Sequence, residues 1–267
     1  MCRVLKVKRS SFYSWLKLPK ITNDLHDFKL HHEVKEIFNR SRESAGSREV
    51  CKQLRRRGFS VGRYKVRKIM HKLNLFVKVK RKYKNTTDSN HSLTVAENIL
   101  QRQFNPKAVN KSWGADITYI PIKNNFVYLS IVIDFYSRKV IGWNLSASMH
   151  AENVVQALEM AIKMRNPRPG LIHHSDRGVQ YASSTYQSFL KKHQVTPSMS
   201  RKGNCWDNAP VERFFATLKS QWIKKRIYDN IEQARQDVSE FINMYYNSVR
   251  THSALNDMTP MEFEKSA

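Results

Sequence analysis

The stretch WGADITYIPIKNNFVYLSIVIDFYSRKVIGWNL, residues 113–145, decides the fold of this chain. Three runs rich in β-branched and aromatic residues lie within it, at 117–122, 126–134 and 140–145, and short polar segments separate them. Runs of this composition and length predict β-strands, and the short breaks predict that successive strands are neighbours. The stretch therefore predicts three adjacent strands of one sheet.

Strands and helices alternate in the residues that follow. The predicted elements are a helix over 154–162, a strand over 171–175, a helix over 186–193, a strand over 195–199, and two helices capped by Asn208 and Asn230. The resulting order, β-β-β-α-β-α-β-α, indicates an α/β fold in which helices flank a mixed five-stranded sheet.

Three carboxylates fall at informative places in this pattern. Asp116 lies within the first strand among apolar residues, and Asp176 ends the fourth strand. A carboxylate in an apolar strand is costly to ionise unless a cation or hydrogen bonds compensate. Glu212 lies in the first turn of the following helix, where an acid is mildly favourable for structural reasons alone. At helical spacing, however, Lys219 shares the side of the helix that carries Glu212.

Metal-assisted phosphoryl transfer is the chemistry that needs three such acids. Two magnesium ions take oxygen ligands and lie about 4 Å apart, so carboxylates on adjoining strands and a facing helix can hold both. We therefore expect Asp116, Asp176 and Glu212 to bind Mg²⁺, with Mn²⁺ as an alternative.

Other polar residues near these acids leave alternatives open. His173 and His174 are candidate zinc ligands, but no cysteine stands at ligand spacing, so they and Asn208 are expected to support the metal ligands or contact substrate. Asp134 is a candidate fourth ligand, and a turn or a pair with Arg138 explains it equally well. We leave Asp134 out of the predicted triad.

The charge of the chain is strongly positive and unevenly distributed. Lys and Arg number 47 against 22 Asp and Glu, a net charge of +25, and residues 1–112 alone hold 28 against 8. Such an excess repels itself unless an anion neutralises it, and nucleic acid is the commonest such anion. A membrane surface is the weaker alternative because the basic segments carry compact helical patterns.

Two absences set the expected environment of the chain. No run approaches the ~18 consecutive apolar residues of a membrane helix. Cys2, Cys51 and Cys205 lie far apart without a C-x-x-C pair, which argues against a disulfide framework or a zinc finger. We expect a cytoplasmic protein with reduced thiols.

Two short amphipathic patterns in the basic half predict a helix-turn-helix. Val50, Cys51 and Leu54 follow Ser47 at helical spacing, and Gly58 then breaks the pattern. The second pattern opens at Ser60; its apolar face holds Val66, Ile69, Met70 and Leu73, and its other faces hold Arg63, Lys65, Arg67 and Lys68. A basic second helix is typical of a DNA reader, so these four cations are predicted DNA contacts.

Four further cations, near the acids in sequence or in the predicted fold, are predicted to contact the phosphate backbone. They are Arg177, Lys202, Lys219 and Arg250. The predicted organisation is a partial helix-turn-helix segment over 1–20, in which Ser10 or Ser11 caps a helix, a helix-turn-helix domain over 27–80, a basic polar linker over 81–104 and a catalytic domain over 105–267.

Ordered blocks of residues in the second half resemble one known family. They are WGADITY (113–119), VIDFYSR (132–138), HHSDRGVQY (173–181), SMSRKGN (198–204), DNAPVE (207–212), YNSVRTH (246–252) and Thr259-Pro260. Asp176 and Glu212 are separated by 35 residues, and Lys219 lies seven residues beyond Glu212. This pattern is similar to the second-reading-frame (OrfB-type) DDE transposases of insertion-sequence family three, and Gly46-Ser47-Arg48 and 58–73 resemble the helix-turn-helix region of that family.

The resemblance implies a fold, an activity and partners. The core would be an RNase-H-like, retroviral-integrase-like domain preceded by an all-α helix-turn-helix region, with Asp116, Asp176 and Glu212 as the catalytic triad. The family cleaves the ends of insertion sequences and joins the freed 3′ hydroxyl to DNA, often through figure-eight and circular intermediates. The implied partners are double-stranded DNA, as element terminal repeats and as target, and further copies of the chain, in a bacterial cytoplasm at the nucleoid. The helical pattern cut short at Met1 adds the expectation of an upstream-frame partner.

Two rival functions remain at this stage. A plain metal-dependent nuclease of the same fold would use water in place of a DNA hydroxyl, but it has less use for a sequence reader. A non-catalytic DNA-binding regulator would not need Asp116, Asp176 and Glu212 together. The intact acids and the basic helices favour the transposase.

Overall fold

The computed structural model describes residues 7–17, 21–77, 93–123, 125–202, 204–223 and 226–266. The chain divides into two compact units, Met1–Lys78 and Val79–Ala267.

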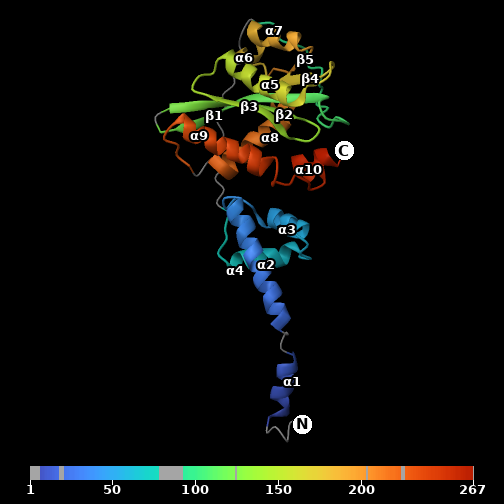
Figure 1. Ribbon diagram of the computed structural model, residues 1–267, viewed down its shortest axis with the longest axis vertical. Helices are drawn as coiled ribbons and strands as arrows, with labels where there is room; N and C mark the ends of the chain where they lie inside the picture. The colour runs from blue at the N-terminus through green and yellow to red at the C-terminus, as the bar shows by residue number, and fades with distance from the viewer. Residues whose placement is uncertain are drawn as a thin grey trace. The chain divides into compact units, whose positions relative to one another are not determined.

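The N-terminal unit is helical (Figure 1). Its described helices are α1 (Arg9–Lys17), α2 (Ile21–Arg40), α3 (Ser47–Arg56) and α4 (Arg63–Lys72). The predicted apolar faces are confirmed: α3 buries Val50, Cys51 and Leu54, and α4 buries Val66, Ile69 and Met70. Leu30, Val34 and Ile37 of α2 complete this core, a helix that the sequence pattern did not predict.

The turn between α3 and α4 differs in detail from the prediction. Gly58 adopts φ +85°, a left-handed conformation that glycine reaches without strain. The second helix begins at Arg63, with Gly62 as its N-cap, so the prediction that Ser60 opens it is wrong by three residues. In the predicted 1–20 segment, α1 begins at Arg9, ahead of both serines expected to cap it, and residues 1–6 and 18–20 lie outside the described residues.

The C-terminal unit is built on a five-stranded mixed sheet in the order β3-β2-β1-β4-β5. Its strands are β1 (Ser112–Ile122), β2 (Asn125–Asp134), β3 (Val140–Ser146), β4 (Ile172–Ser175) and β5 (Thr196–Met199). β1, β2 and β3 pair antiparallel, whereas β1, β4 and β5 pair parallel. The predicted α/β class and the mixed sheet are confirmed.

Helices cover both faces of this sheet (Figure 1). One face packs against α5 (Ala151–Arg165), α6 (Val179–Ala182) and α7 (Ser184–Lys192), and the other against α8 (Ala209–Thr217) and α9 (Ile231–Ser239). Side chains of β1 alternate between the layers, so Trp113 joins the α5 core and Ile120 joins the α8 core.

Shorter elements complete the unit. They are the 3-10 turn η1 (Cys205–Asn208), the π-helical turns η2 (Leu218–Trp222) and η4 (Glu240–Tyr246), the 3-10 turn η5 (Ser253–Leu255) and the helix α10 (Pro260–Lys265). The helix expected over 186–193 is α7, which begins two residues earlier, at Ser184, because Ser183 caps it by accepting a hydrogen bond from the Tyr186 N–H. The short helix α6 before it was not predicted. Among the described helices, none is long and apolar enough to cross a membrane.

The predicted linker over 81–104 is too long. Its part over 93–104 packs on the C-terminal unit, where Leu100 is buried and its N–H donates to Ser198 Oγ at 3.1 Å. Val95, Ala96 and Phe104 also pack against the unit, but the segment forms no helix or strand, so its apolar residues follow no regular period that the sequence could reveal. Residues 81–92 lie outside the described residues.

Candidate active site

Two of the predicted acids stand side by side where β1 and β4 run parallel. Gly114 is opposite His174 in the register, and Asp116 and Asp176 follow two residues further along each chain. Parallel neighbours are about 4.8 Å apart, so the two carboxylates share one end of the sheet. Backbone N–H groups orient both: Ile117 N donates to Asp116 at 2.7 Å, and Gly178 N donates to Asp176 at 2.9 Å.

Glu212 reaches the same end of the sheet from α8. The helix lies so close to β1 that a Cβ at Gly114 would come within 2.8 Å of Val211 Cγ2. Asn208 occupies the N-cap position, but its side chain does not cap the helix. Its amide instead donates to the Ala115 carbonyl at 3.1 Å, which ties the start of α8 to the residue before Asp116.

The electrostatics of the acids confirm that they are neighbours. Burial and then the charge of Asp176 raise the pKa of Asp116 well above its ordinary value, against the hydrogen bond from Ile117. Glu212 raises the pKa of Asp116 further, and Lys219 lowers it. Burial also raises the pKa of Glu212. Asp116 is therefore the common neighbour of the other two acids, and their charges disfavour its ionised form.

The three carboxylates do not converge on a single point. Among the described residues, the set of three side chains whose ligand atoms all lie within 4.8 Å of one another is His32, Glu33 and Glu36 on α2. That exposed set is already engaged, because Arg57 pairs with both glutamates. A wider spread suits the acids, since two ions about 4 Å apart do not require every ligand to touch the same ion.

The donor set around Asp116 fits a hydrated divalent cation. Carboxylate oxygens are the ligands that Mg²⁺ prefers, and the ion keeps several waters. Two buried atoms here have no hydrogen-bond partner: the Tyr181 hydroxyl and Asn208 Oδ1. Burial and the charges of Asp116 and Asp176 raise the pKa of Tyr181 well above its usual value, so the phenol keeps its proton. An unpaired buried polar atom costs about 1–3 kcal/mol, and metal-bound waters would provide the missing partners.

Lys219 lies beside the acids, as its position on the Glu212 side of the helix predicted. Its ammonium is 4.3 Å from the centroid of the Tyr119 ring. Burial lowers the pKa of Lys219, and the negative charge of Asp116 opposes that shift. A half-buried cation next to three acids is well placed to contact a phosphate.

The other cations predicted near the acids have different surroundings. Lys202 is exposed. Arg177 donates through Nε to the Ser200 carbonyl at 2.6 Å, a bond that ties the turn after Asp176 to the end of β5. Arg250 bonds Gln221 and Thr251, each at 3.4 Å, so its placement next to the acids is not confirmed.

The two histidines are structural. His174 bonds Ser198 Oγ at 2.9 Å through Nδ1 and Ser200 Oγ at 3.2 Å through Nε2, and His173 Nε2 bonds the Tyr186 hydroxyl at 2.8 Å. These bonds leave His174 no free ring nitrogen for a zinc ion, and through them the two histidines brace β4 against β5 and α7. The alternative reading of Asp134 as a turn residue is confirmed, since it accepts from Asn110 N and Tyr136 N, both at 2.8 Å.

The buried histidines predict a pH-dependent stability. Burial lowers the pKa of His173 to about 3 and that of His174 to about 4, from 6.5. The unfolded chain therefore takes up protons first, and stability that is complete above 6.5 is lost as the pH falls toward 4. From about pH 7 to about pH 5 the free energy of unfolding should drop by roughly 4 kcal/mol from these rings. Urea unfolding of His174→Gln should show about half that drop; an undiminished drop would exclude His174 as a source.

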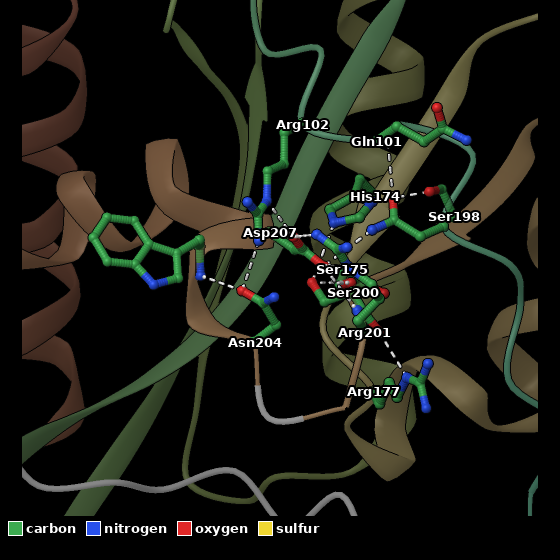
Figure 2. Close-up of polar contacts among 12 residues, drawn as sticks. Gln101, Arg102, His174, Ser175, Arg177, Ser198, Ser200, Arg201, Asn204 and Asp207 are labelled. Atoms are coloured by element: carbon green, nitrogen blue, oxygen red, sulfur yellow. Dashed lines mark hydrogen bonds and ion pairs between the residues drawn. The ribbon is translucent and has the colours of Figure 1, made fainter.

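An ion-pair cluster that the sequence did not predict holds the loop between β5 and α8. The carboxylate of Asp207 is fully buried, and Figure 2 shows Arg102 and Arg201 converging on it. Arg102 Nε donates at 2.7 Å, Arg201 donates at 2.9 and 3.0 Å from its guanidinium and at 3.0 Å from its backbone N, and Asn98 Nδ2 donates at 3.0 Å. These bonds hold the pKa of Asp207 far below its usual range. Arg102 lies 105 residues away in sequence, so no local pattern links the two.

The cations predicted to read DNA lie on the outside of α4. Arg63, Arg67 and Lys68 are exposed, as the helical pattern predicted. Lys65 is exposed too, but its ammonium pairs with Asp27 of α2 at 2.9 Å. Lys65 is therefore partly neutralised within the unit.

Comparisons with known proteins cover nearly the whole chain. Two family models described as Integrase core domain match residues 106–205 and 193–260, and one described as HTH-like domain matches 25–83. Transposase InsF for insertion sequence IS3A, from Escherichia coli (strain K12), is 37% identical over 266 residues, which are 99% of this chain and 92% of that protein. Insertion element IS600 uncharacterized 31 kDa protein, from Shigella sonnei, is 37% identical over 99% of this chain and 97% of its own length.

A solved structure supports the fold. A chain of the simian T-cell lymphotropic virus intasome, determined in complex with PP2A regulatory subunit B56 gamma, aligns with a TM-score of 0.50 and 16% identity. The alignment covers 78% of this chain and 68% of that one. At this identity the likeness concerns the fold alone.

Proposed function

Because this chain belongs to the IS3 family of insertion-sequence transposases, enzymes of DNA transposition with an integrase core, we propose that Asp116, Asp176 and Glu212 are its catalytic acids. An integrase core implies divalent metal ions, and we assign Mg²⁺, with Mn²⁺ as an alternative. The observation that supports the assignment is the position of Asp116 and Asp176, each two residues beyond the paired Gly114 and His174 of β1 and β4, with Glu212 close enough to shift the pKa of Asp116.

Each residue has a distinct task in strand transfer. When bound, the metal ions supply activation of the attacking hydroxyl and stabilisation of the leaving oxygen. Asp116, Asp176 and Glu212 would hold the ions, with Asp116 the acid that is influenced by both others, and Asn208 keeps the start of α8, and with it Glu212, in place through its bond to Ala115. Lys219 contacts the phosphate next to the joint. His173, His174 and Arg177 keep the surrounding strands and turn in place through their bonds to Tyr186 and the serines.

The helical N-terminal unit binds DNA, and we propose that α4 reads the terminal repeats of the element. Target DNA then enters the acid site, where Lys202 and Lys219 are the predicted backbone contacts. Two element ends must be joined in one reaction, so we propose that several copies assemble on DNA, in the bacterial cytoplasm at the nucleoid, together with an upstream-frame protein. Arg250 is a predicted DNA contact outside the acid site.

A strand-joining assay tests this function. Labelled terminal DNA is incubated with Mg²⁺ and either the unaltered chain or Glu212→Gln, which keeps the shape of the side chain and removes its charge. The unaltered chain should yield joined products and Glu212→Gln should yield none. Nicks alone would indicate a nuclease, and binding alone would indicate a regulator.

Exposed cations of α4 should set the salt dependence of DNA binding. Removing Arg63 and Arg67 together as Arg63→Gln/Arg67→Gln should weaken binding and reduce the slope of log K against log salt by about 2, because each phosphate contact contributes about 0.9. Fluorescence anisotropy at several salt concentrations measures the slope. Arg57→Gln is the control, since Glu33 and Glu36 already engage Arg57 and its loss should leave the slope unchanged. An unchanged slope in the double variant would show that Arg63 and Arg67 do not contact DNA phosphates.

A further inference from the structure

An exposed tryptophan lies on the loop that leads to Glu212. Trp206 is 70% exposed, against 47% for Phe126, the next most exposed of the phenylalanine, tyrosine and tryptophan side chains among the described residues of the C-terminal unit. Single exposed apolar residues are common and need no explanation by themselves. Trp206 differs because hydrogen bonds and ion pairs hold the residues on both sides of it, and because this turn lies close to the three acids.

The chain on both sides of Trp206 is fixed. Asp207, the next residue, is the fully buried centre of the ion-pair cluster with Arg102 and Arg201 (Figure 2). On the other side, Asn204 Oδ1 accepts from the Trp206 N–H at 3.2 Å and from Arg102 Nη2 at 3.0 Å. The backbone that carries the indole is therefore anchored on both sides while its ring faces solvent.

This anchored turn lies next to the acids. Asn208, two residues beyond Trp206, bonds the carbonyl of Ala115, which precedes Asp116. Consecutive Cα atoms are about 3.8 Å apart, so the Cα of Trp206 is at most about 7.6 Å from that of Asn208. Nucleotides of one strand rise about 3.4 Å each, so the indole is within a few nucleotides of a phosphodiester held at the acids.

The charge around Trp206 suits a nucleic acid. The Arg201 side chain is 55% exposed although it pairs with Asp207, and Lys202 is exposed. The one carboxylate on this turn, Asp207, is buried and fully engaged, so it does not repel a phosphate. Cations beside an exposed aromatic ring are the arrangement that binds unstacked nucleotides, with a base on the ring and phosphates on the cations.

We propose that Trp206 stacks on a nucleobase at the end of the element DNA, next to the phosphodiester that reacts, and holds that base out of the duplex. The proposal rests on the proposed function, because the acids define which phosphodiester reacts. An unpaired end lets the backbone approach the acids, which a closed duplex end hinders. Trp206 is thus a residue for DNA-end positioning, and the buried Asp207 cluster fixes the place of its ring.

Strand joining on two kinds of DNA end tests the proposal. Trp206→Ala should join fully paired ends about tenfold more slowly than the unaltered chain, which is the size of effect that loss of one base-stacking contact causes. On ends whose terminal bases are already unpaired, its rate should lie within about threefold of the unaltered chain's rate. Trp206→Tyr keeps an aromatic ring and should retain most of the rate on both ends. Ile227→Ala, which removes another exposed apolar side chain of the unit, should change neither rate.

A photocrosslink gives a readout that does not depend on strand joining. Terminal DNA carrying 5-iodouracil near the reacting phosphodiester is bound to the Glu212→Gln chain and irradiated, and the crosslink should map to Trp206 and vanish in Glu212→Gln/Trp206→Ala. Thermal unfolding should be the same for both chains, since the indole is exposed. A normal rate on paired ends, a defect that unpaired ends do not relieve, a crosslink elsewhere, or a change of oligomeric state without a crosslink would overturn the proposal. Absence of joining by the unaltered chain would instead refute the proposed function.

Discussion

Asp116→Asn is expected to reduce strand joining by more than about a hundredfold while DNA binding stays within about threefold of the unaltered chain. Loss of a group that only orients a metal ligand costs about 10–100-fold, so loss of an acid that would hold the metal directly should cost more. The basic N-terminal unit supplies most of the binding, and it is unaltered. Joining assays and anisotropy on the same DNA separate the two effects, and normal joining would show that Asp116 is not a catalytic acid.

The same substitution should make the metal-free protein more stable. The pKa of Asp116 in the folded chain lies well above 3.8, its value in the unfolded chain, so the stability present at low pH is lost as the pH rises through that window. At neutral pH the ionised carboxylate therefore costs stability, and an amide removes that cost. Asp116→Asn should melt at a higher temperature than the unaltered chain in EDTA. Mg²⁺ should then raise the melting temperature of the unaltered chain but not that of Asp116→Asn, because the ion binds the folded state through Asp116.

Asp134→Asn provides the matched control for this stability effect. Asp134 is also a buried strand carboxylate, but it accepts two backbone hydrogen bonds and serves the turn after β2. Its replacement should lower the melting temperature and preserve the stabilisation by Mg²⁺. Equal stabilisation of Asp116→Asn by Mg²⁺ would place the cation elsewhere.

Gly142→Ala is expected to destabilise the C-terminal unit by more than about 3 kcal/mol, near the upper limit for overpacking. Gly142 lies on β3 where α5 crosses the sheet, and a Cβ there would lie 2.1 Å from the Ala157 carbonyl oxygen and 2.9 Å from Ala161 Cβ. The nearer atom belongs to the helix backbone, so no side-chain rotation relieves the clash. Denaturant unfolding monitored by tryptophan fluorescence gives the magnitude.

Two further variants identify the source of that loss. Gly142→Ala/Ala161→Gly removes the clash with the methyl group and should remain unstable, because the carbonyl of Ala157 stays. Gly170→Ala places a side chain at φ +97° in open space, and it should cost only about 1–2 kcal/mol. A rescue by Ala161→Gly, or equal losses at Gly142 and Gly170, would contradict close packing of α5 on β3.

The local patterns of the sequence were sufficient for most elements of the sheet and for the choice of acids. Apolar runs placed all five strands, because a strand that is buried on one or both faces is mostly apolar whatever its partners are. An acid inside such a run, as Asp116 is, stands out from its neighbours. Lys219 was placed beside Glu212 by helical periodicity alone, and the structure puts it next to Asp116.

Contacts between distant segments had no such signal. The sequence did not show that His174 is held by Ser198 and Ser200, or that Asp207 is bound by Arg102, because a single polar residue looks the same whether it is exposed or paired in the interior.

What the sequence by itself determined is therefore the class of the fold and the five strands, and it predicted the basic DNA-binding helix and the three acids. The tertiary structure alone decided that Gly114 lies opposite His174, which brings Asp116 near Asp176, that Asn208 ties α8 to β1, and that Trp206 is presented on a fixed turn. The reason is physical. Periodicity reports only which side of an element is buried, whereas register, helix approach and ion pairing are set by the packing of residues that can lie more than 100 positions apart.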